Sequence, residues 1–448
     1  MRRILDRRRV ALLIGFAIAV GAFGAAPPTA DAGYECVMVA AGQDPTNPAN
    51  LTIAGATAAG TGENVACGPF ADASGDSAFN IAIGESAVAS GDGTANVAIG
   101  HLSWALGDDS VAVGRNATTG VVAPDSISIG TDAFAGAVGA IAIGQESDAG
   151  GANSAAFGSQ STASGGNATA VGSNSTASGS QSAAFGRSSS ATGQNSTAVG
   201  VLSSATAINT SAFGIGSTAS GAAGSAFGGG STASGISSSA FGNSSTASGD
   251  GSTAAGINSM ASGTGSSAYG LGSTASGSGG AAYGANSVAN GANSVAIGIG
   301  AQATFDNSAA YGTGATASRA GQQVFGTSSN TYTMAGIGSQ ASRDAQSGPL
   351  YLVTSDGNGN LASSAFDVGH LTGEIKNVGA LSAALAGLHP NARAKGDNHL
   401  SAAVGNYQGQ FGLAAGFFRN VGDTMLFSVG GAVSGGHVSS NAGVTLSW

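Results

Sequence analysis

A short hydrophobic pattern that ends in glycine recurs along most of the chain. It runs as Asn80-Ile-Ala-Ile-Gly84, then Asn96-Val-Ala-Ile-Gly100, and continues in further copies to Gln323-Val-Phe-Gly326. From Gly144 onward the repeat glycines are fourteen residues apart without a slip. Periods this regular are typical of stacked repeat architectures. The pattern therefore predicts one stacked head over residues 77–326.

Each repeat unit is expected to form strand, turn, strand, turn. Fourteen residues also equal two heptads, but a coiled coil is excluded because each unit carries about two glycines and many Ser and Thr. The first strand alternates with period two, as at 295–297, and the second is represented by 161–163. Asn suits the corners because it tolerates the left-handed backbone region. The recurrent corner residues are Asn153, Asn167, Asn195, Asn209, Asn293 and Asn307.

The residues one and three positions before each repeat glycine must point the same way. In the early units both are aliphatic, as in Val111 and Val113, whereas later the second becomes aromatic and the first shrinks, as in Ala155 and Phe157. Such volume compensation is typical of a packed core of fixed width. We therefore expect these side chains to point inward. The predicted head core comprises Ile83, Ile99, Val113, Ile129, Ile143, Phe157, Phe185, Phe213, Phe241 and Ile297.

A single coil of this composition has too few large side chains to bury such a stripe. Left alone, the Ile/Phe stripe would face water along the whole stack, and apolar patches of that size mark interaction surfaces. Three stripes packed against one another on a symmetry axis would remove the exposure. The head therefore predicts a homotrimer.

The C-terminal segment has a different pattern. Residues 327–370 are rich in Ser, Gly and Asn and are expected to form a neck or linker. Residues 371–388 carry apolar positions at helical spacing, and four strand-length segments follow at about 398–407, 410–419, 424–433 and 439–448. Ten-residue strands with one apolar face are typical of an outer-membrane barrel, although a small soluble sheet is the alternative. Four strands cannot close a barrel, whereas three chains would supply twelve.

The N-terminus is typical of a signal peptide, here assigned to residues 1–32. A basic start, an apolar stretch over 10–26 and the Ala30-Asp-Ala32 site favour cleavage over a retained transmembrane anchor. Cys36 and Cys67 fall in a predicted N-terminal cap, residues 33–76, and in an exported protein they are candidates for a disulfide.

Composition and motif spacing argue against several classes of function. Gly makes up 78 of the 448 residues without a collagen period, and the net charge of −10 argues against nucleic-acid binding. No His or Cys lies at metal-ligand spacing, and no Gly-rich stretch continues as a phosphate-binding loop. We therefore expect no enzyme, no metal and no cofactor.

One candidate ligand patch lies at the irregular end of the head. His101-Leu-Ser-Trp104 places a large aromatic side chain where other units have Ser and Ala, and Asp108 and Asp109 follow. An exposed Trp with acidic neighbours suits recognition of a partner. The alternative is that Trp104 packs on the adjacent turn.

These features together resemble the trimeric autotransporter adhesins, the YadA-like family of bacterial outer-membrane proteins. The family's head motif is matched literally at Asn293-Ser-Val-Ala-Ile-Gly298, and residues 371–448 resemble its anchor. The resemblance implies an all-β chain with a short α segment. Its parts would be a trimeric left-handed parallel β-roll head, a short neck, and an anchor giving one helix and four strands to a twelve-stranded trimeric transmembrane barrel in outer-membrane lipid. Trp448 would be the C-terminal aromatic signal read by the barrel-assembly machinery.

The implied function is that of a cell-surface adhesin exported by its own barrel, with the head exposed outside the cell. Its partners would be extracellular proteins, cells or abiotic surfaces, and autoagglutination is a further expectation. The sequence departs from the family in lacking a long heptad stalk. Two alternatives stay open: a secreted solenoid binding ice, glycan or another extended surface, prompted by recurrent Ser-Thr-Ala-Ser, and a polysaccharide-active solenoid enzyme, which would need carboxylates clustered on one face.

Overall fold

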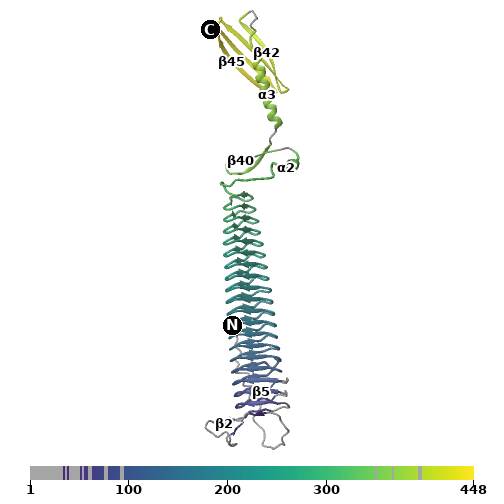
Figure 1. The fold of residues 1–448 in the computed structure, drawn as a ribbon, viewed down its shortest axis with the longest axis vertical. Helices are drawn as coiled ribbons and strands as arrows, with labels where there is room; N and C mark the ends of the chain where they lie inside the picture. The colour runs from purple at the N-terminus through teal and green to yellow at the C-terminus, as the bar shows by residue number, and fades with distance from the viewer. Residues whose placement is uncertain are drawn as a thin grey trace. The chain divides into compact units, whose positions relative to one another are not determined.

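A computed structural model describes residues 34–35, 38–39, 51–52, 55–58, 63–74, 79–90, 95–348, 351–365, 368–391 and 396–448. The chain divides into two compact units, Met1–Thr331 and Tyr332–Trp448. The first contains the stacked coils and the second contains helix α3 and the C-terminal sheet (Figure 1). The predicted signal peptide and Cys36 lie outside the described residues, whereas Cys67 is disulfide-bonded.

In the first unit, one strand of every coil joins a long parallel sheet, which we call the first sheet. Neighbouring strands pair in register, so that Val199, for example, lies opposite Phe185 and Phe213. The strands of this sheet are β1 (Tyr34–Glu35), β4 (Val65–Cys67), β5 (Phe79–Ile83), β7 (Ala95–Ile99), β9 (Val111–Val113), β11 (Ile127–Ile129), β13 (Ile141–Ile143), β15 (Ala155–Phe157), β17 (Thr169–Val171), β19 (Ala183–Phe185), β21 (Thr197–Val199), β23 (Ser211–Phe213), β25 (Ser225–Phe227), β27 (Ser239–Phe241), β29 (Thr253–Ala255), β31 (Ser267–Tyr269), β33 (Ala281–Tyr283), β35 (Val295–Ile297), β37 (Ala309–Tyr311) and β39 (Gln323–Phe325).

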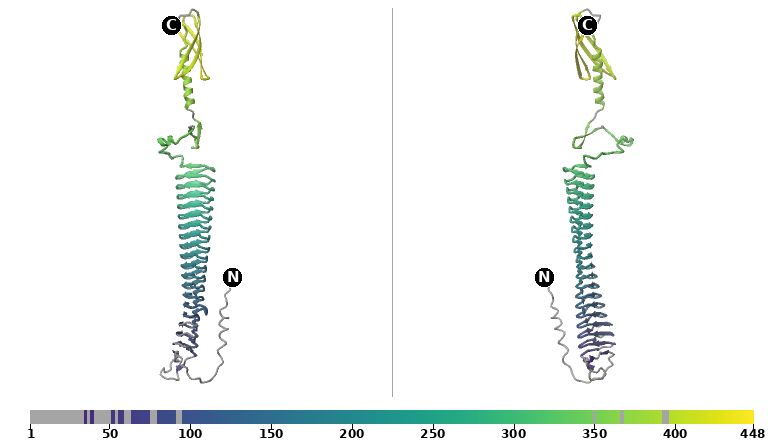
Figure 2. Two further views of the ribbon diagram at one scale, coloured as in Figure 1. Left: turned by 90° about the vertical axis from the view of Figure 1, so that its right-hand side faces the viewer. Right: turned by 60° about the vertical axis from the view of Figure 1, so that its left-hand side comes forward.

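The other strand of each coil joins a second parallel sheet, and β2 (Met38–Val39) pairs separately with β3 (Leu51–Thr52). Figure 2 shows the coils stacked rung upon rung. The strands of the second sheet are β6 (Val88–Ala89), β8 (Trp104–Ala105), β10 (Thr118–Thr119), β12 (Phe134–Ala135), β14 (Asp148–Ala149), β16 (Thr162–Ala163), β18 (Thr176–Ala177), β20 (Ser190–Ala191), β22 (Ser204–Ala205), β24 (Thr218–Ala219), β26 (Thr232–Ala233), β28 (Thr246–Ala247), β30 (Met260–Ala261), β32 (Thr274–Ala275), β34 (Val288–Ala289), β36 (Gln302–Ala303) and β38 (Thr316–Ala317).

The interior of the coil is built almost entirely from alanine and serine. The middle residue of most first-sheet strands, such as Ala226, is fully buried, and so is the alanine of most second-sheet strands, such as Ala233. These alanines form continuous clusters along the stack. The two sheets therefore lie back to back at a separation that admits only small side chains.

The prediction that the large side chains fill this interior is wrong. They flank the buried alanine and point to the outer face of the first sheet, where none of them is buried. The residues concerned are Ile83, Ile99, Val113, Ile129, Ile143, Phe157, Phe185, Phe213, Phe241 and Ile297. The cause is strand parity: in a three-residue strand the outer two side chains share one face, and only the middle one points into the coil. The small middle residue sets how closely the sheets approach.

The turns follow the predicted chemistry. All six corner asparagines have φ between 52° and 57°, in the left-handed region. The repeat glycines are required for a second reason, the close approach of the next coil, as Gly172 shows. Its φ is 129°, and a Cβ there would lie 2.6 Å from the carbonyl oxygen of Gly186 in the next coil. Any side chain at this position would separate the coils, which explains why the glycine recurs in every unit.

A ladder of buried asparagines stabilises the N-terminal coils. Asn64, Asn80 and Asn96 are fully buried. The backbone N–H of Asn80 donates to Asn64 Oδ1 (2.9 Å), Asn96 Nδ2 donates to Asn80 Oδ1 (3.2 Å), and the backbone N–H of Ser110 donates to Asn96 Oδ1 (3.0 Å). The ladder links successive coils where the repeat length is still irregular.

The second unit begins with the neck, which contains elements that the sequence does not predict. These are a five-residue helix, α2 (Gln340–Asp344), and an antiparallel hairpin of β40 (Tyr351–Ser355) and β41 (Leu361–Ala365). Ser339 caps the helix by accepting a hydrogen bond from the backbone N–H of Ser342. Every residue of β40 is exposed in the single chain.

The C-terminal sheet agrees closely with the predicted anchor. Helix α3 (Val368–Ala386) is followed by four antiparallel strands, β42 (Asn398–Tyr407), β43 (Gln410–Val421), β44 (Met425–Ser434) and β45 (His437–Leu446). The helix packs on one face of this sheet, where Leu381 and Ala384 contact Ala414 and Ala432. The opposite face carries exposed apolar side chains, including Phe411, Leu413, Phe417, Val429 and Val444.

Candidate functional site

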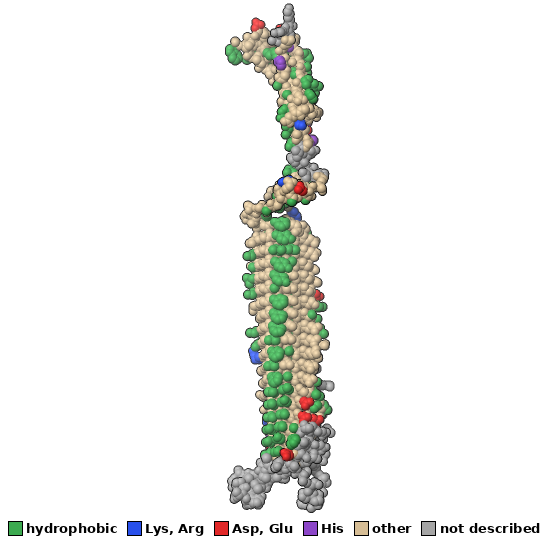
Figure 3. All heavy atoms as spheres, turned by 45° about the vertical axis from the view of Figure 1, so that its right-hand side comes forward, with side chains coloured by type: hydrophobic (Ala, Val, Ile, Leu, Met, Phe, Trp, Pro, Cys, Tyr) green, Lys and Arg blue, Asp and Glu red, His purple; other side chains and the backbone are tan. Residues whose placement is uncertain are grey.

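The most extensive surface feature of the head is the apolar stripe on the outer face of the first sheet, visible in Figure 3. Phe213, Phe227 and Phe241 stack with ring centroids 4.8 and 5.5 Å apart, and Tyr269 stacks on Tyr283 at 5.1 Å. The Phe241 side chain is nevertheless 44% exposed in the single chain. A continuous apolar stripe of this length marks a surface that binds another apolar surface.

The volume compensation noted in the sequence occurs on the outer face of the first sheet. Along the stripe, Ser225 accompanies Phe227 whereas Val97 accompanies Ile99, so the pair in each coil fills a similar volume on the outer face. Compensation on an exposed face would serve no purpose in an isolated coil. It indicates a partner surface at a constant distance along the stack.

The four residues of the predicted ligand patch are not brought together. His101 lies in the turn before β8, and Asp108 and Asp109 lie in the turn after it, so the strand separates them on opposite edges of the coil. His101 Nε2 lies 3.7 Å from Glu85 Oε2, while Asp109 Oδ1 accepts a hydrogen bond from the backbone N–H of Ala95 (3.0 Å). The patch predicted from sequence is therefore corrected to two separate groups.

Trp104 behaves as a packing residue. It lies on β8 between Val88 of β6 and Thr118 of β10, and its side chain is half-buried. Its indole Nε1 is buried and has no hydrogen-bond partner among the described residues. The geometry therefore favours the alternative interpretation, in which Trp104 packs on the adjacent coils.

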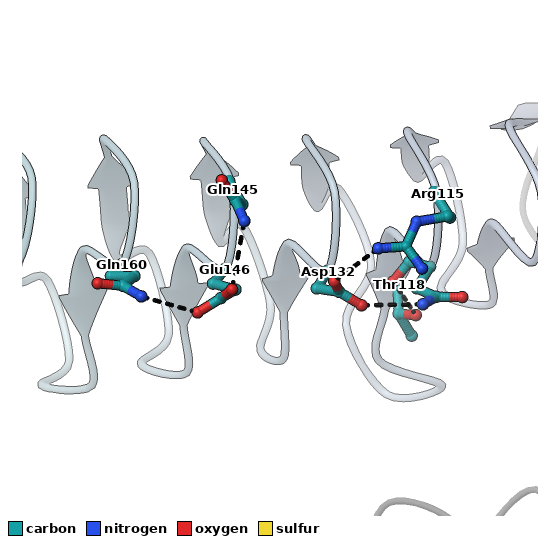
Figure 4. A network of polar contacts seen from close by, with 7 residues as sticks. Arg115, Thr118, Asp132, Gln145, Glu146 and Gln160 are labelled. Carbon is teal, nitrogen blue, oxygen red and sulfur yellow. Dashed lines mark hydrogen bonds and ion pairs between the residues drawn. The ribbon is translucent and has the colours of Figure 1, made fainter.

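A ladder of polar contacts runs along the edge formed by the turns after the first-sheet strands (Figure 4). Asp132 accepts a hydrogen bond from Asn116 Nδ2 (2.9 Å) and lies 3.6 Å from an Arg115 nitrogen. Farther along, Gln160 Nε2 donates to Glu146 Oε2 (2.9 Å). Exposed pairs of this kind contribute little to stability.

The same edge changes character along the stack. The residue directly after the repeat glycine is charged in several early coils, whereas in the later half it is often a large aliphatic side chain, exposed to 67% in Ile215 and 61% in Ile299. The edge therefore has a polar N-terminal half and an apolar C-terminal half. These aliphatic residues are Val201, Ile215, Ile257, Leu271 and Ile299.

The helix of the anchor lies directly on glycines of the sheet. A Cβ on Gly412 of β43 would lie 2.5 Å from the carbonyl oxygen of Ala380, and one on Gly405 of β42 would overlap the backbone at Ala384. The sequence predicts small residues inside the barrel, but these two positions are not among the predicted site residues. The sequence feature that could have identified them is a glycine at an inward-facing position in each of two neighbouring strands.

One end of α3 contacts the β44–β45 turn through an acidic residue that is also absent from the predicted sites. Glu374 Oε2 lies 2.8 Å from His437 Nε2, and Glu374 Oε1 lies 3.6 Å from His370 Nε2. Beside them, Asn377 lies against Gly435, where any Cβ would meet the amide. Within the described ranges no group of three or more His, Cys, Asp or Glu residues has the geometry to hold a metal ion.

Among the residues that the structure describes, no helix has both the length and the apolar character needed to span a membrane.

Two family models match this chain. A family model described as the YadA head domain repeat matches segments 81–94, 97–117, 123–147, 149–175, 177–203, 233–259, 254–279 and 289–315, and the YadA-like membrane anchor domain matches 390–448. A solved structure of the collagen-binding domain of the Yersinia adhesin YadA is 18% identical; the match covers 57% of this chain and 86% of that one, with a TM-score of 0.12. No curated protein matches the chain. The similarity therefore rests on the two family models.

Proposed function

Because the chain belongs to the YadA-like family of trimeric autotransporter adhesins, anchored in the outer membrane with the head on the cell surface, we propose that it attaches cells to extracellular protein or to other surfaces. Binding rather than catalysis is the proposed role. The observation that carries it is the combination of the anchor sheet with a long, rigid repeat head whose single chain leaves a continuous stripe unpartnered.

The stripe supports a specific arrangement of the three chains. We place the outer faces of the three first sheets against one another on the threefold axis, which buries Phe213, Phe227 and Phe241 from all three. Burial of apolar area at about 25 cal/mol per Å² would make this contact the main source of head stability. The second sheet of each chain then faces outward.

This arrangement predicts which positions form cross-links between chains. We expect Phe227→Cys, near the axis, to give disulfide-linked dimers on mild oxidation, because equivalent residues approach one another around a threefold axis. Ser234→Cys, on the second sheet side, is the matched control and is expected to give none. Both variants would be made with Cys36 and Cys67 intact and resolved on non-reducing gels. Cross-linking at position 234 but not at 227 would show that the second sheet, and not the first, faces the threefold axis.

The anchor supports export through the same trimer. Three copies of β42–β45 would supply twelve strands around three α3 helices, with the exposed apolar face toward lipid. Trp448, at the C-terminus beside β45, is proposed as the aromatic signal for the barrel-assembly machinery. Lipid and assembly factors are proposed partners.

Adhesion itself is tested by display in a non-adherent Gram-negative host. We expect cells that carry the full chain to bind immobilised matrix protein, cultured cells or plastic, and to clump, whereas cells carrying only the anchor with its signal peptide do not. Display would be verified independently by protease accessibility of the head on intact cells. Equal binding by both strains, with the head displayed, would refute the adhesin proposal.

A further inference from the structure

The outer face of the second sheet carries an unusually regular surface between β16 and β28. Each strand there presents two hydroxyl side chains outward, on either side of a buried alanine. They stand in two straight columns because neighbouring strands pair in register, for example Thr218 with Thr232. We call this surface the hydroxyl array. Its residues are Thr162, Ser164, Thr176, Ser178, Ser190, Thr192, Ser204, Thr206, Thr218, Ser220, Thr232, Ser234, Thr246 and Ser248.

Every rung of the array contains one threonine and one serine. Most rungs read Thr-Ala-Ser, but in β20 and β22 the order is reversed, with Ser190 beside Thr192 and Ser204 beside Thr206. Each rung therefore presents two hydroxyls and one methyl, whichever column holds the threonine. The array therefore has the same composition on every rung. It ends at Met260, which replaces threonine in the next rung.

The hydroxyls of the array are free to bind something outside the chain. Across the described residues, none of them forms a side-chain hydrogen bond to another group of the chain, unlike the buried serines of the turns, such as Ser217, whose Oγ donates to the carbonyl oxygen of Gly214 (2.9 Å). Those in the first column are half-buried and those in the second are exposed. A rigid sheet thus presents hydroxyls whose hydrogen bonds must come from solvent or a ligand.

The array lacks the side chains that usually dominate binding to proteins. It holds no charge and no aromatic side chain, and the whole segment from 149 to 305 contains only Arg187 and Asp250 as charged residues, both in turns. Protein hot spots are built on Trp, Tyr and Arg. The array also lacks the aromatic side chains on which sugar rings stack.

The array instead repeats regularly in two directions, as a crystalline surface of hydrogen-bonding groups does. Stacked strands repeat at about 4.8 Å, and two residues along a strand span about 6.6 Å. We propose that the hydroxyl array binds ice, with the hydroxyls hydrogen-bonded to lattice water and the threonine methyls seated between water molecules. Each hydrogen bond contributes little by itself, but an array of them engages many at once.

This inference goes beyond attachment to proteins and cells and uses the orientation given under the proposed function, in which the second sheet faces outward. It would make ice one of the surfaces to which the displayed head attaches. The array lies on the sheet opposite the apolar stripe, so formation of the trimer would leave all three arrays accessible.

The test uses cells that display the full chain, cooled slowly in contact with a growing ice surface. We expect displaying cells to be incorporated into the ice and cells with the anchor alone to be excluded. The double variant Thr218→Lys with Thr232→Lys should lose incorporation down to the level of the anchor-only cells, because two long side chains lift the array away from the lattice. The matched control, Gln194→Lys with Asn243→Lys, adds the same charge at exposed turn positions and should keep it.

The outcomes separate the two proposals. Display and trimer formation are measured first, by protease accessibility and by a heat-resistant band, so loss of either concerns the adhesin proposal. With display intact, exclusion of wild-type cells from ice overturns the ice proposal. Equal behaviour of the two double variants overturns the array as the binding surface, and retention on crystalline cellulose without incorporation into ice overturns ice as the ligand.

Discussion

Gly412→Val is expected to abolish the trimer in the outer membrane. Gly412 lies where α3 rests on β43, and even its first added carbon would come within 2.5 Å of the Ala380 carbonyl oxygen. That contact is with helix backbone, so no side-chain rotation relieves it. The helix would have to leave the sheet, which removes the packing of Leu381 and Ala384 on Ala414 and Ala432. The substitution would disturb the packing of α3 on the sheet in each of the three chains of the trimer.

The measurement is the heat-modifiable trimer band of the outer-membrane fraction, together with surface display of the head. Gly431→Val is the matched control. It adds the same side chain to the adjacent strand β44, on the face away from α3, where a Cβ would lie 3.7 Å from its nearest neighbour, the carbonyl oxygen of Ser439. We expect this control to assemble normally. A stable, displayed trimer of Gly412→Val would show that the helix does not pack on this glycine.

Ala226→Leu is expected to disrupt the coils around β25. Ala226 is fully buried between the two sheets of its coil, opposite other alanines, and the interior offers no space for three further carbon atoms. Overpacking costs about 1–3 kcal/mol per site, and the trimer would carry it three times. Because each coil touches only its neighbours, the defect should remain local.

Limited proteolysis of displayed heads, followed by mass spectrometry, would locate the opened region. We expect new cleavage sites near residue 226 and an unchanged pattern far from it. Ala222→Leu, at a partly exposed turn position in the same coil, is the matched control and should leave the pattern unchanged. Equal protease resistance in both variants would mean that the sheets separate easily, contrary to a tightly packed alanine interior.

The period of the repeat is enough to predict most of the fold. A fixed spacing of fourteen residues, with glycine at 172 and asparagine at 167, places strands and turns, because these residues suit the backbone required there. The anchor strands are also predictable, since the apolar face of β43 at Phe411, Leu413 and Phe417 alternates cleanly.

The direction of the head side chains is not predictable in the same way. Sequence reasoning assigns the largest apolar side chains to the interior, so it places Val111 and Val113 inside and Ala112 outside. The opposite is true, because only the middle side chain of each three-residue strand points into the coil, and we propose that the large outer side chains contact the other chains of the trimer. The ligand patch is wrong for a related reason: the short β8 turns residues that are close in sequence to opposite edges.

The neck hairpin escapes prediction because Ser, Gly and Asn dominate its segment, and strands with both faces exposed have no hydrophobic alternation to detect. The inward glycines at 405 and 412 are not identified from the sequence, because glycine adds no side chain to the hydrophobic pattern. Their importance becomes visible only when the structure places the backbone of α3 against them.

The alanine interior also bears on how such a head changes length between generations. Since every coil presents the same small side chains to its neighbours, unequal recombination that removes or duplicates one fourteen-residue unit joins surfaces that already match. Each event would alter the reach of the adhesin by a single strand spacing, about 4.8 Å. The length of the head can therefore change in steps of one coil, and selection can act on that length while the fold stays the same.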